Sequence, residues 1–239
     1  PAEIRAPAGT TFGVSAFQIN FGARKIMTSG DKLDVLIAMN PAALVTNLED
    51  VKANGIVIAD SGAFTDRNLA KAGYDENPLE NNSLENYRLV KIDMSRLTVE
   101  AVKEFGLSNK EALRSKNMWA LGLVYWMYGR KRQASVDWLE AKFAKNSDIA
   151  KANIAALNAG HAFGETAEMP AELGNFDVEP AKIEPGLYRT ITGAESVSLG
   201  LLAGSLLADL KIAFCSYPIT PASSLLHQLA RMKEFGVVT

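Results

Sequence analysis

The sequence contains a single cysteine, Cys215, among its 239 residues. One thiol cannot form a disulfide within the chain, and it cannot build an iron–sulfur cluster or a cysteine-ligated zinc site. Scarcity of cysteine fits a reducing compartment, so we expect a cytoplasmic protein. Cys215 lies in the apolar segment KIAFCSY, where we expect a packed thiol rather than a nucleophile.

The sequence also has no large excess of charge of one sign and no long apolar run. The formal net charge is −2, and the densest basic cluster, residues 130–133, is explained by favourable charges at the end of a helix. We therefore expect no nucleic-acid partner. No apolar run reaches the roughly 18 residues that a membrane span needs, so we expect no membrane association either.

An initiator methionine and a dinucleotide motif are absent as well. The chain begins at Pro1 in a stretch typical of a domain interior, so we expect the sequence to be a truncated one. No GxGxxG precedes Asp60, at the end of the segment GIVIAD. A cap or turn role for Asp60 is therefore preferred to ribose binding, and only a strand–helix–strand pattern supports a nucleotide-dependent dehydrogenase.

That pattern begins with the apolar run Asp34–Asn40, which predicts a buried strand. Pro41 suits the first position of a following helix, and a second buried strand is predicted from Gly55. A crossover of this kind makes the two strands parallel. A further strand from Tyr87 and a helix ending at Gly106 complete the pattern of a doubly wound α/β sheet.

Helical patterns dominate from Asn109 to about Gly164, and we expect these helices to cover the sheet. Residues 165–189 are rich in proline and glutamate without an apolar period, which predicts a linker. The chain therefore divides into a domain over residues 1–164 and a second, incomplete domain over residues 190–239. In the second domain Gly193, Gly200 and Gly204 allow a helix to pack closely on a neighbour.

The stretch CSYPITPAS places two prolines between an apolar strand and a helix. Pro218 favours an extended backbone at the residue before it, whereas Thr220 and Pro221 suit the cap and first position of a helix. The amides at the start of that helix, with the hydroxyls of Thr220 and Ser223, suit an anion. A well-capped helix without a ligand explains the same residues.

The motif YPITPAS, preceded by ITGAESVSLGLLAGSLLADL, resembles the thiamine-binding domain of 2-oxoacid:ferredoxin oxidoreductases. The stretch PAEIRAPAGTTFGVSAFQINFG resembles the gamma-type region fused ahead of it in long alpha subunits. The resemblance implies that residues 1–164 form a Rossmann-like gamma-type α/β domain, and that residues 190–239 begin a thiamine-diphosphate pyrimidine-binding α/β domain. The 2-oxoglutarate type is favoured.

The resemblance also implies roles for the elbow. Thr220 binds the carboxylate of the 2-oxoacid, whereas Tyr217, Pro218, Ile219 and Pro221 adjoin the thiamine. Ser223 is assigned to the same substrate site because its hydroxyl suits an anion. No catalytic residue is expected within the chain, because the family's glutamate is expected beyond Thr239.

Implied partners complete this picture. The chain has no GDG motif and no cysteine cluster, so thiamine diphosphate with Mg²⁺ and the [4Fe–4S] cluster are expected on a beta-type subunit. Ferredoxin is expected to accept the electrons, and coenzyme A the acyl group. A non-catalytic assembly module that docks such a partner would show the same absences.

The two histidines, His161 and His227, are far apart in sequence and lack a third partner for a triad or metal site. We expect both to lie on helix surfaces.

Overall fold

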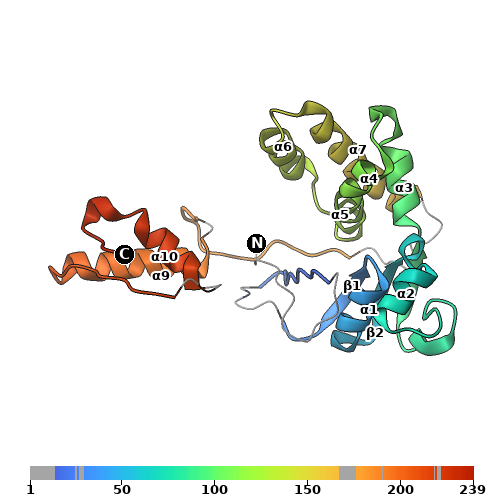
Figure 1. The fold of residues 1–239 in the computed structure, drawn as a ribbon, viewed down its shortest axis with the longest axis horizontal. Coiled ribbons are helices and arrows are strands. Elements are labelled where there is room, and N and C mark those ends of the chain that lie inside the picture. The colour runs from blue at the N-terminus through green and yellow to red at the C-terminus, as the bar shows by residue number, and fades with distance from the viewer. Residues whose placement is uncertain are drawn as a thin grey trace. The chain divides into compact units, whose positions relative to one another are not determined.

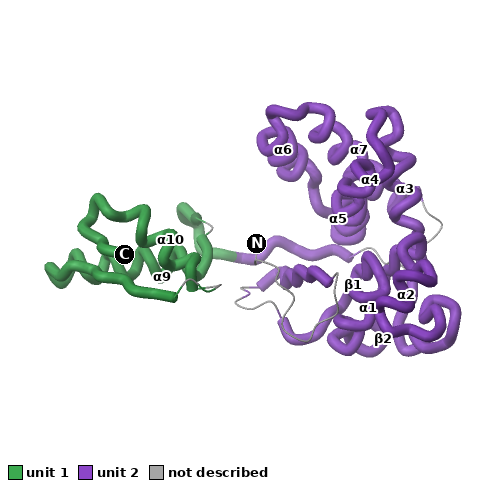
Figure 2. The backbone as a smooth tube through the Cα atoms, viewed as in Figure 1, with its two compact units in different colours: residues 1–5, 183–239 green, residues 6–182 purple. Residues whose placement is uncertain are grey.

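The structure is a computed structural model that describes residues 14–24, 26, 30–166, 176–189, 191–217, 219 and 222–239. It divides into two compact units (Figure 2). Unit 2 lies within residues 6–182, and unit 1 contains residues 183–239. The domain boundaries at 164 and 190 stay a prediction.

In its described part, unit 2 is built around a parallel sheet of three strands, in the order β1-β2-β3. The strands are β1 (Leu33–Ala38), β2 (Val51–Asp60) and β3 (Arg88–Ile92). The last six residues of β2 are all buried, because helices cover both faces of this central strand. The α/β fold class is therefore confirmed.

Alternate residues of the sheet enter two separate cores. Val57 and Ala59 pack with the helices α1 (Pro41–Asn47) and α2 (Asp66–Ala72). Ile56 and Ile58 face the opposite core, which is built with α3 (Met94–Ala101), α5 (Lys116–Met127) and α7 (Ser147–Thr166) (Figure 1). The predicted helices after Asn109 thus cover one face of the sheet.

Glycines bring α5 and α7 into backbone contact. A Cβ atom on Gly122 would lie 1.9 Å from the carbonyl oxygen of Leu157, and one on Gly160 would lie 1.8 Å from that of Trp119. Each glycine therefore faces the backbone of the other helix at a distance that no larger residue permits. The two glycines set the spacing of the helical layer, although neither stood out in the sequence.

The remaining helical elements of unit 2 are short. They are α4 (Asn109–Ala112), α6 (Gln133–Lys142) and the 3₁₀ turns Leu48–Asp50, Ser61–Ala63, Asn82–Leu84, Lys103–Phe105 and Leu113–Ser115. Helix α1 begins as predicted, with Pro41 in its first turn and Asn40 Oδ1 accepting from the amide of Ala43 at 2.8 Å. None of the helices in the described ranges is long and apolar enough to cross a bilayer.

Unit 1 contains α9 (Gly193–Leu207), α10 (Ala222–Ala230) and a 3₁₀ turn at Lys233–Phe235. Between the helices, the segment KIAFCSY forms a single parallel bridge, from Ala213 to Val238, in place of the predicted full strand. Ile212 and Phe214 turn toward a small core around Leu202 and Leu229. This alternation carries Cys215 to the outer face, so the expectation of a packed thiol is wrong for the described chain.

Much of α9 is uncovered. Leu207 is 90% exposed, and Cβ atoms on Gly193, Gly200 and Gly204 would meet no described atom within 4 Å. The close approach expected at these glycines is therefore not made within the described part of this chain.

Candidate functional site

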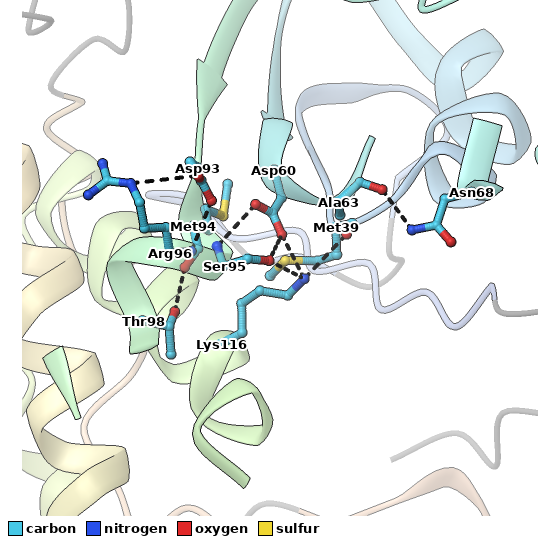
Figure 3. Close-up of polar contacts among 10 residues, drawn as sticks. All are labelled: Met39, Asp60, Ala63, Asn68, Asp93, Met94, Ser95, Arg96, Thr98 and Lys116. Carbon is cyan, nitrogen blue, oxygen red and sulfur yellow. Dashed lines mark hydrogen bonds and ion pairs between the residues drawn. The ribbon is translucent and has the colours of Figure 1, made fainter. Parts of the chain in front are cut away.

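The polar groups of unit 2 converge at the carboxyl edge of its sheet. Asp60 ends β2, Met39 follows β1, and Ser95 lies in the first turn of α3, directly after β3 (Figure 3). Lys116 reaches the same point from the first residue of α5. Ligands of parallel α/β sheets bind at this edge, so these residues form one candidate site.

Every polar atom at the centre of this cluster has a partner. Asp60 is fully buried, and its Oδ1 accepts from the amide of Ser95 at 3.1 Å. Its Oδ2 accepts from Ser95 Oγ and from Lys116 Nζ, both at 2.7 Å. The ammonium also lies 3.4 Å from the carbonyl of Met39 and from Ser95 Oγ. An ammonium has three donors, so this Lys116 has none left for a ligand.

The neighbouring cap explains why α3 begins where it does. Asp93 Oδ1 accepts from the amide of Arg96 at 2.9 Å, while Asp60 takes the amide of Ser95. Two aspartates thus satisfy two of the free amides at this helix start. A Cβ atom on Gly62 would lie 2.3 Å from Asp93 Oδ1, so a larger residue there would displace the capping carboxylate.

The cap role expected for Asp60 is met away from its own turn, because its carboxylate accepts from the amide of Ser95 at the start of α3. Asp60 makes no side-chain cap for the turn that follows it; it pairs instead with groups 35 and 56 residues away. Its burial also leaves no carboxylate presented to a ribose, which argues against the dehydrogenase reading. Sequence reasoning missed Ser95 and Lys116, because no local pattern marks a pairing over such a separation.

The described residues of the elbow in unit 1 lie on the surface. Tyr217 is 85% exposed and Ile219 is 63% exposed, and the amide of Ile219 donates to the carbonyl of Tyr217 at 2.8 Å. Pro218, Thr220 and Pro221 lie outside the described residues. The structure therefore presents an exposed aromatic and an exposed aliphatic side chain at the end of the segment that follows Phe214.

Ser223 is engaged with the elbow itself. Its amide donates to the carbonyl of Ile219 at 3.0 Å, and its Oγ donates to the same oxygen at 3.3 Å. The amide of Ser223 is therefore not one of the free donors expected at the start of this helix. Ser223 thus braces the backbone of Ile219.

The two histidines differ in environment. His227, on α10, is exposed as expected. His161, on α7, keeps only 17% of its side chain exposed, so the expected surface role is wrong for it. Its Nδ1 is buried and makes no hydrogen bond among the described residues, and the Glu165 carboxylate lies 3.4 Å away outside hydrogen-bond geometry. Burial, and then the charge of Arg132, lower the pKa of His161 from 6.5, against the opposing effect of Glu165.

Within the described ranges, no group of three or more His, Cys, Asp or Glu side chains is placed to hold a metal ion.

Comparison with known proteins gives three matches. The model of the family described as "Pyruvate ferredoxin/flavodoxin oxidoreductase" matches residues 2–163. The chain is 48% identical over all 239 residues to the 2-oxoglutarate oxidoreductase subunit KorA of Mycobacterium tuberculosis (strain ATCC 25618 / H37Rv), of which it covers 36%. It thus spans about a third of the length of this relative.

A solved structure shares the fold. It is the 2-oxoglutarate:ferredoxin oxidoreductase from Magnetococcus marinus with 2-oxoglutarate, coenzyme A and succinyl-CoA bound, and it matches with a TM-score of 0.61 at 24% identity. The match covers 90% of this chain and 33% of that one.

Proposed function

Because this chain belongs to the pyruvate ferredoxin/flavodoxin oxidoreductase family, we propose that it is part of the alpha subunit of a 2-oxoacid:ferredoxin oxidoreductase. The reaction is oxidative decarboxylation of a 2-oxoacid, with 2-oxoglutarate favoured, to carbon dioxide and an acyl-CoA. Two electrons pass one at a time to ferredoxin. We place the enzyme in the cytoplasm.

The 48% identity to KorA, which extends over every part of this chain, carries the proposal. The match includes the elbow YPITPAS as well as the gamma-type region. The name of that relative as a 2-oxoglutarate oxidoreductase subunit favours this substrate and a multi-subunit assembly. The Magnetococcus marinus enzyme, with coenzyme A bound, supports coenzyme A as the acyl acceptor.

The described elbow residues fit a role beside thiamine diphosphate. Tyr217 and Ile219 expose apolar surface, which suits one wall of a pocket for a flat aminopyrimidine ring. Pro218 and Pro221 are assigned to the same wall by the family motif. Thiamine diphosphate, when bound, supplies the carbon nucleophile for decarboxylation. The chain contributes orientation and exclusion of water at this wall.

The substrate carboxylate is assigned to Thr220. Its hydroxyl provides a neutral donor, and the start of α10 provides a partial positive charge at the same place. Ser223 supports this arrangement by holding the Ile219 carbonyl. In this proposal Ser223 is a positioning residue whose hydroxyl proton is already in use.

The diphosphate-binding site and the iron–sulfur cluster are assigned to a partner subunit. We propose a beta-type subunit that holds the diphosphate through Mg²⁺ and carries the [4Fe–4S] cluster. Cys215, as the only cysteine of the chain, leaves cluster ligation to that subunit.

Replacement of Thr220 tests the proposal. In the complete complex, Thr220→Ala should raise the apparent KM for 2-oxoglutarate by about 10-fold or more, because a hydrogen bond to a charged group contributes about 1.5–3 kcal/mol. Thr220→Ser retains the hydroxyl and should stay within a few-fold of wild type. Steady-state kinetics, with gel filtration to confirm assembly, measures both variants. An unchanged KM in Thr220→Ala would reject the assigned role.

The exposure of Tyr217 and Ile219 also suits a non-catalytic assembly module that docks a partner. Purification of the complex separates the two functions. A co-purifying partner with bound thiamine diphosphate and an iron–sulfur absorption band supports the enzyme. A partner with neither supports the module.

A further inference from the structure

A second polar region of unit 2 lies beyond the carboxyl end of α5. The connection from α5 to α6 and the facing side of α7 line an open cavity of about 660 Å³. Its charged lining consists of three cations and one carboxylate: Arg130, Lys131, Arg132 and Glu165. Helix α5 has 12 residues and therefore extends about 18 Å, so this cavity is well separated from Lys116 at its other end.

The positive charge of the cavity is not neutralised within the described chain. None of the three cations forms an ion pair with a described carboxylate. Arg132 Nη1 instead donates to the neutral Asn158 Oδ1 at 2.8 Å. Arg130 Nη2 lies 3.4 Å from the carbonyl of Val178, and its guanidinium covers the ring of Phe21 at 5.4 Å.

These contacts hold the guanidinium groups in place and leave their charge free for a ligand. Like charges held close together repel one another, and a multiply charged anion between them relieves that repulsion. Arginine forks match the geometry of phosphate oxygens better than a lysine point charge does.

His161 and Trp126 line the same cavity as the three cations. His161 Nδ1 is inaccessible to solvent and makes no hydrogen bond in the described chain. Beside it, Gly164 leaves space for the ring of Trp126, since a Cβ atom there would lie 2.3 Å from that ring. The imidazole and the indole thus form a fixed wall of the cavity.

From this combination we infer that the cavity between Arg130, Arg132 and His161 binds the phosphate or diphosphate group of a small molecule. The inference uses residues of unit 2 alone, so its failure would leave the function proposed for the elbow standing. The cations of the α5–α6 connection face the anion, and His161 adds a proton-dependent contact.

Isothermal titration calorimetry of the full-length protein with inorganic pyrophosphate tests the inference. We expect saturable binding at one site per chain, weakened about 10-fold or more by Arg132→Gln. Because Arg132 also contacts Asn158, Lys131→Gln provides a second variant with an exposed side chain, for which a loss of about 3-fold is expected. Absence of saturable binding in the wild type would overturn the inference.

The matched control is Lys145→Gln, which makes the same charge change at an exposed position outside the cavity. It should leave the affinity unchanged. An equal loss in Lys145→Gln and Lys131→Gln would show diffuse attraction to the surface and would also overturn the inference.

Proton uptake gives an independent readout. Titrations in buffers of different ionisation enthalpy should show that the wild type takes up more protons on binding than His161→Gln does. Because pyrophosphate itself takes up the same number of protons in both titrations, its contribution cancels in the difference between wild type and His161→Gln. His227→Gln should match the wild type. Equal uptake by all three proteins would remove His161 from the site.

Discussion

At the scale of single residues, the stability of unit 2 depends on the buried carboxylate of Asp60. It is completely buried, and Lys116 supplies its only ion pair there. Removing one member of a buried pair leaves an uncompensated charge, which costs more than the pair itself contributes.

We therefore predict that Lys116→Met destabilises unit 2 by about 3–5 kcal/mol. Differential scanning calorimetry of the full-length protein should show a lower unfolding temperature. Lys110→Met, at an exposed position on α4, should change stability by less than about 0.5 kcal/mol. Addition of Asp60→Asn to Lys116→Met should recover part of the loss. A Lys116→Met protein as stable as wild type would contradict the stabilising role of this ion pair.

His161 gives a second prediction at this scale. Because burial holds the pKa of His161 below 6.5, the unfolded chain takes up this proton at a higher pH than the folded protein. The stabilisation is thus complete above pH 6.5 and decreases as the pH falls below it, toward the lower folded pKa. Unfolding temperatures measured between pH 5 and 8 should fall less steeply for His161→Gln than for the wild type. His227→Gln, at the exposed histidine, should follow the wild type.

At the scale of elements, the helix pair α5 and α7 depends on backbone contact at Gly122 and Gly160. Gly160→Ala would place a methyl group against the carbonyl of Trp119, and backbone cannot move aside as a flexible side chain does. We predict destabilisation of about 1–3 kcal/mol or more, measured by urea unfolding. Gly204→Ala, within a helix at a position with open space, should stabilise unit 1 by about 0.5–1 kcal/mol. A neutral Gly160→Ala would mean that the helices separate readily.

The same elements show which features of the fold could be predicted from the sequence and which could not. Local patterns predicted the three parallel strands and the start of α1, because apolar runs and Pro41 act within a few residues. The irregular register at the start of β2, where Asn54 has a φ of +59°, was not predicted. Nor were the glycine contacts of α5 with α7, which depend on how two distant helices meet. The motif at the elbow gave the family, but the described geometry there shows only exposed side chains and a braced turn.

At the scale of the whole molecule, the exposed apolar residues of unit 1 bear on how the chain associates with a partner. Leu206, Leu207 and Leu210 are 58%, 90% and 69% exposed at the end of α9 and just beyond it. Exposed apolar groups gathered in this way are typical of a surface that another polypeptide covers. In the proposed assembly that polypeptide is the thiamine-bearing subunit.

We predict that Leu207→Gln weakens association with that subunit by about 10-fold, since burial of one leucine contributes about 1.5–3 kcal/mol. The substitution should leave the circular dichroism of the protein unchanged, because the side chain makes little contact in its own chain. Leu113→Gln, at an exposed leucine of unit 2, is the matched control. Analytical ultracentrifugation of the purified subunits measures the association. Equal association of both variants and wild type would place the interface elsewhere.

The ion pair between Asp60 and Lys116 also constrains how this protein changes over evolutionary time. Either residue alone is costly to replace, whereas a joint exchange for two neutral side chains of similar volume is tolerable. Positions 60 and 116 should therefore covary among relatives, and Ser95 should vary with them. Such a triplet of linked substitutions would mark the sheet edge of this fold in sequences that share no continuous motif with it.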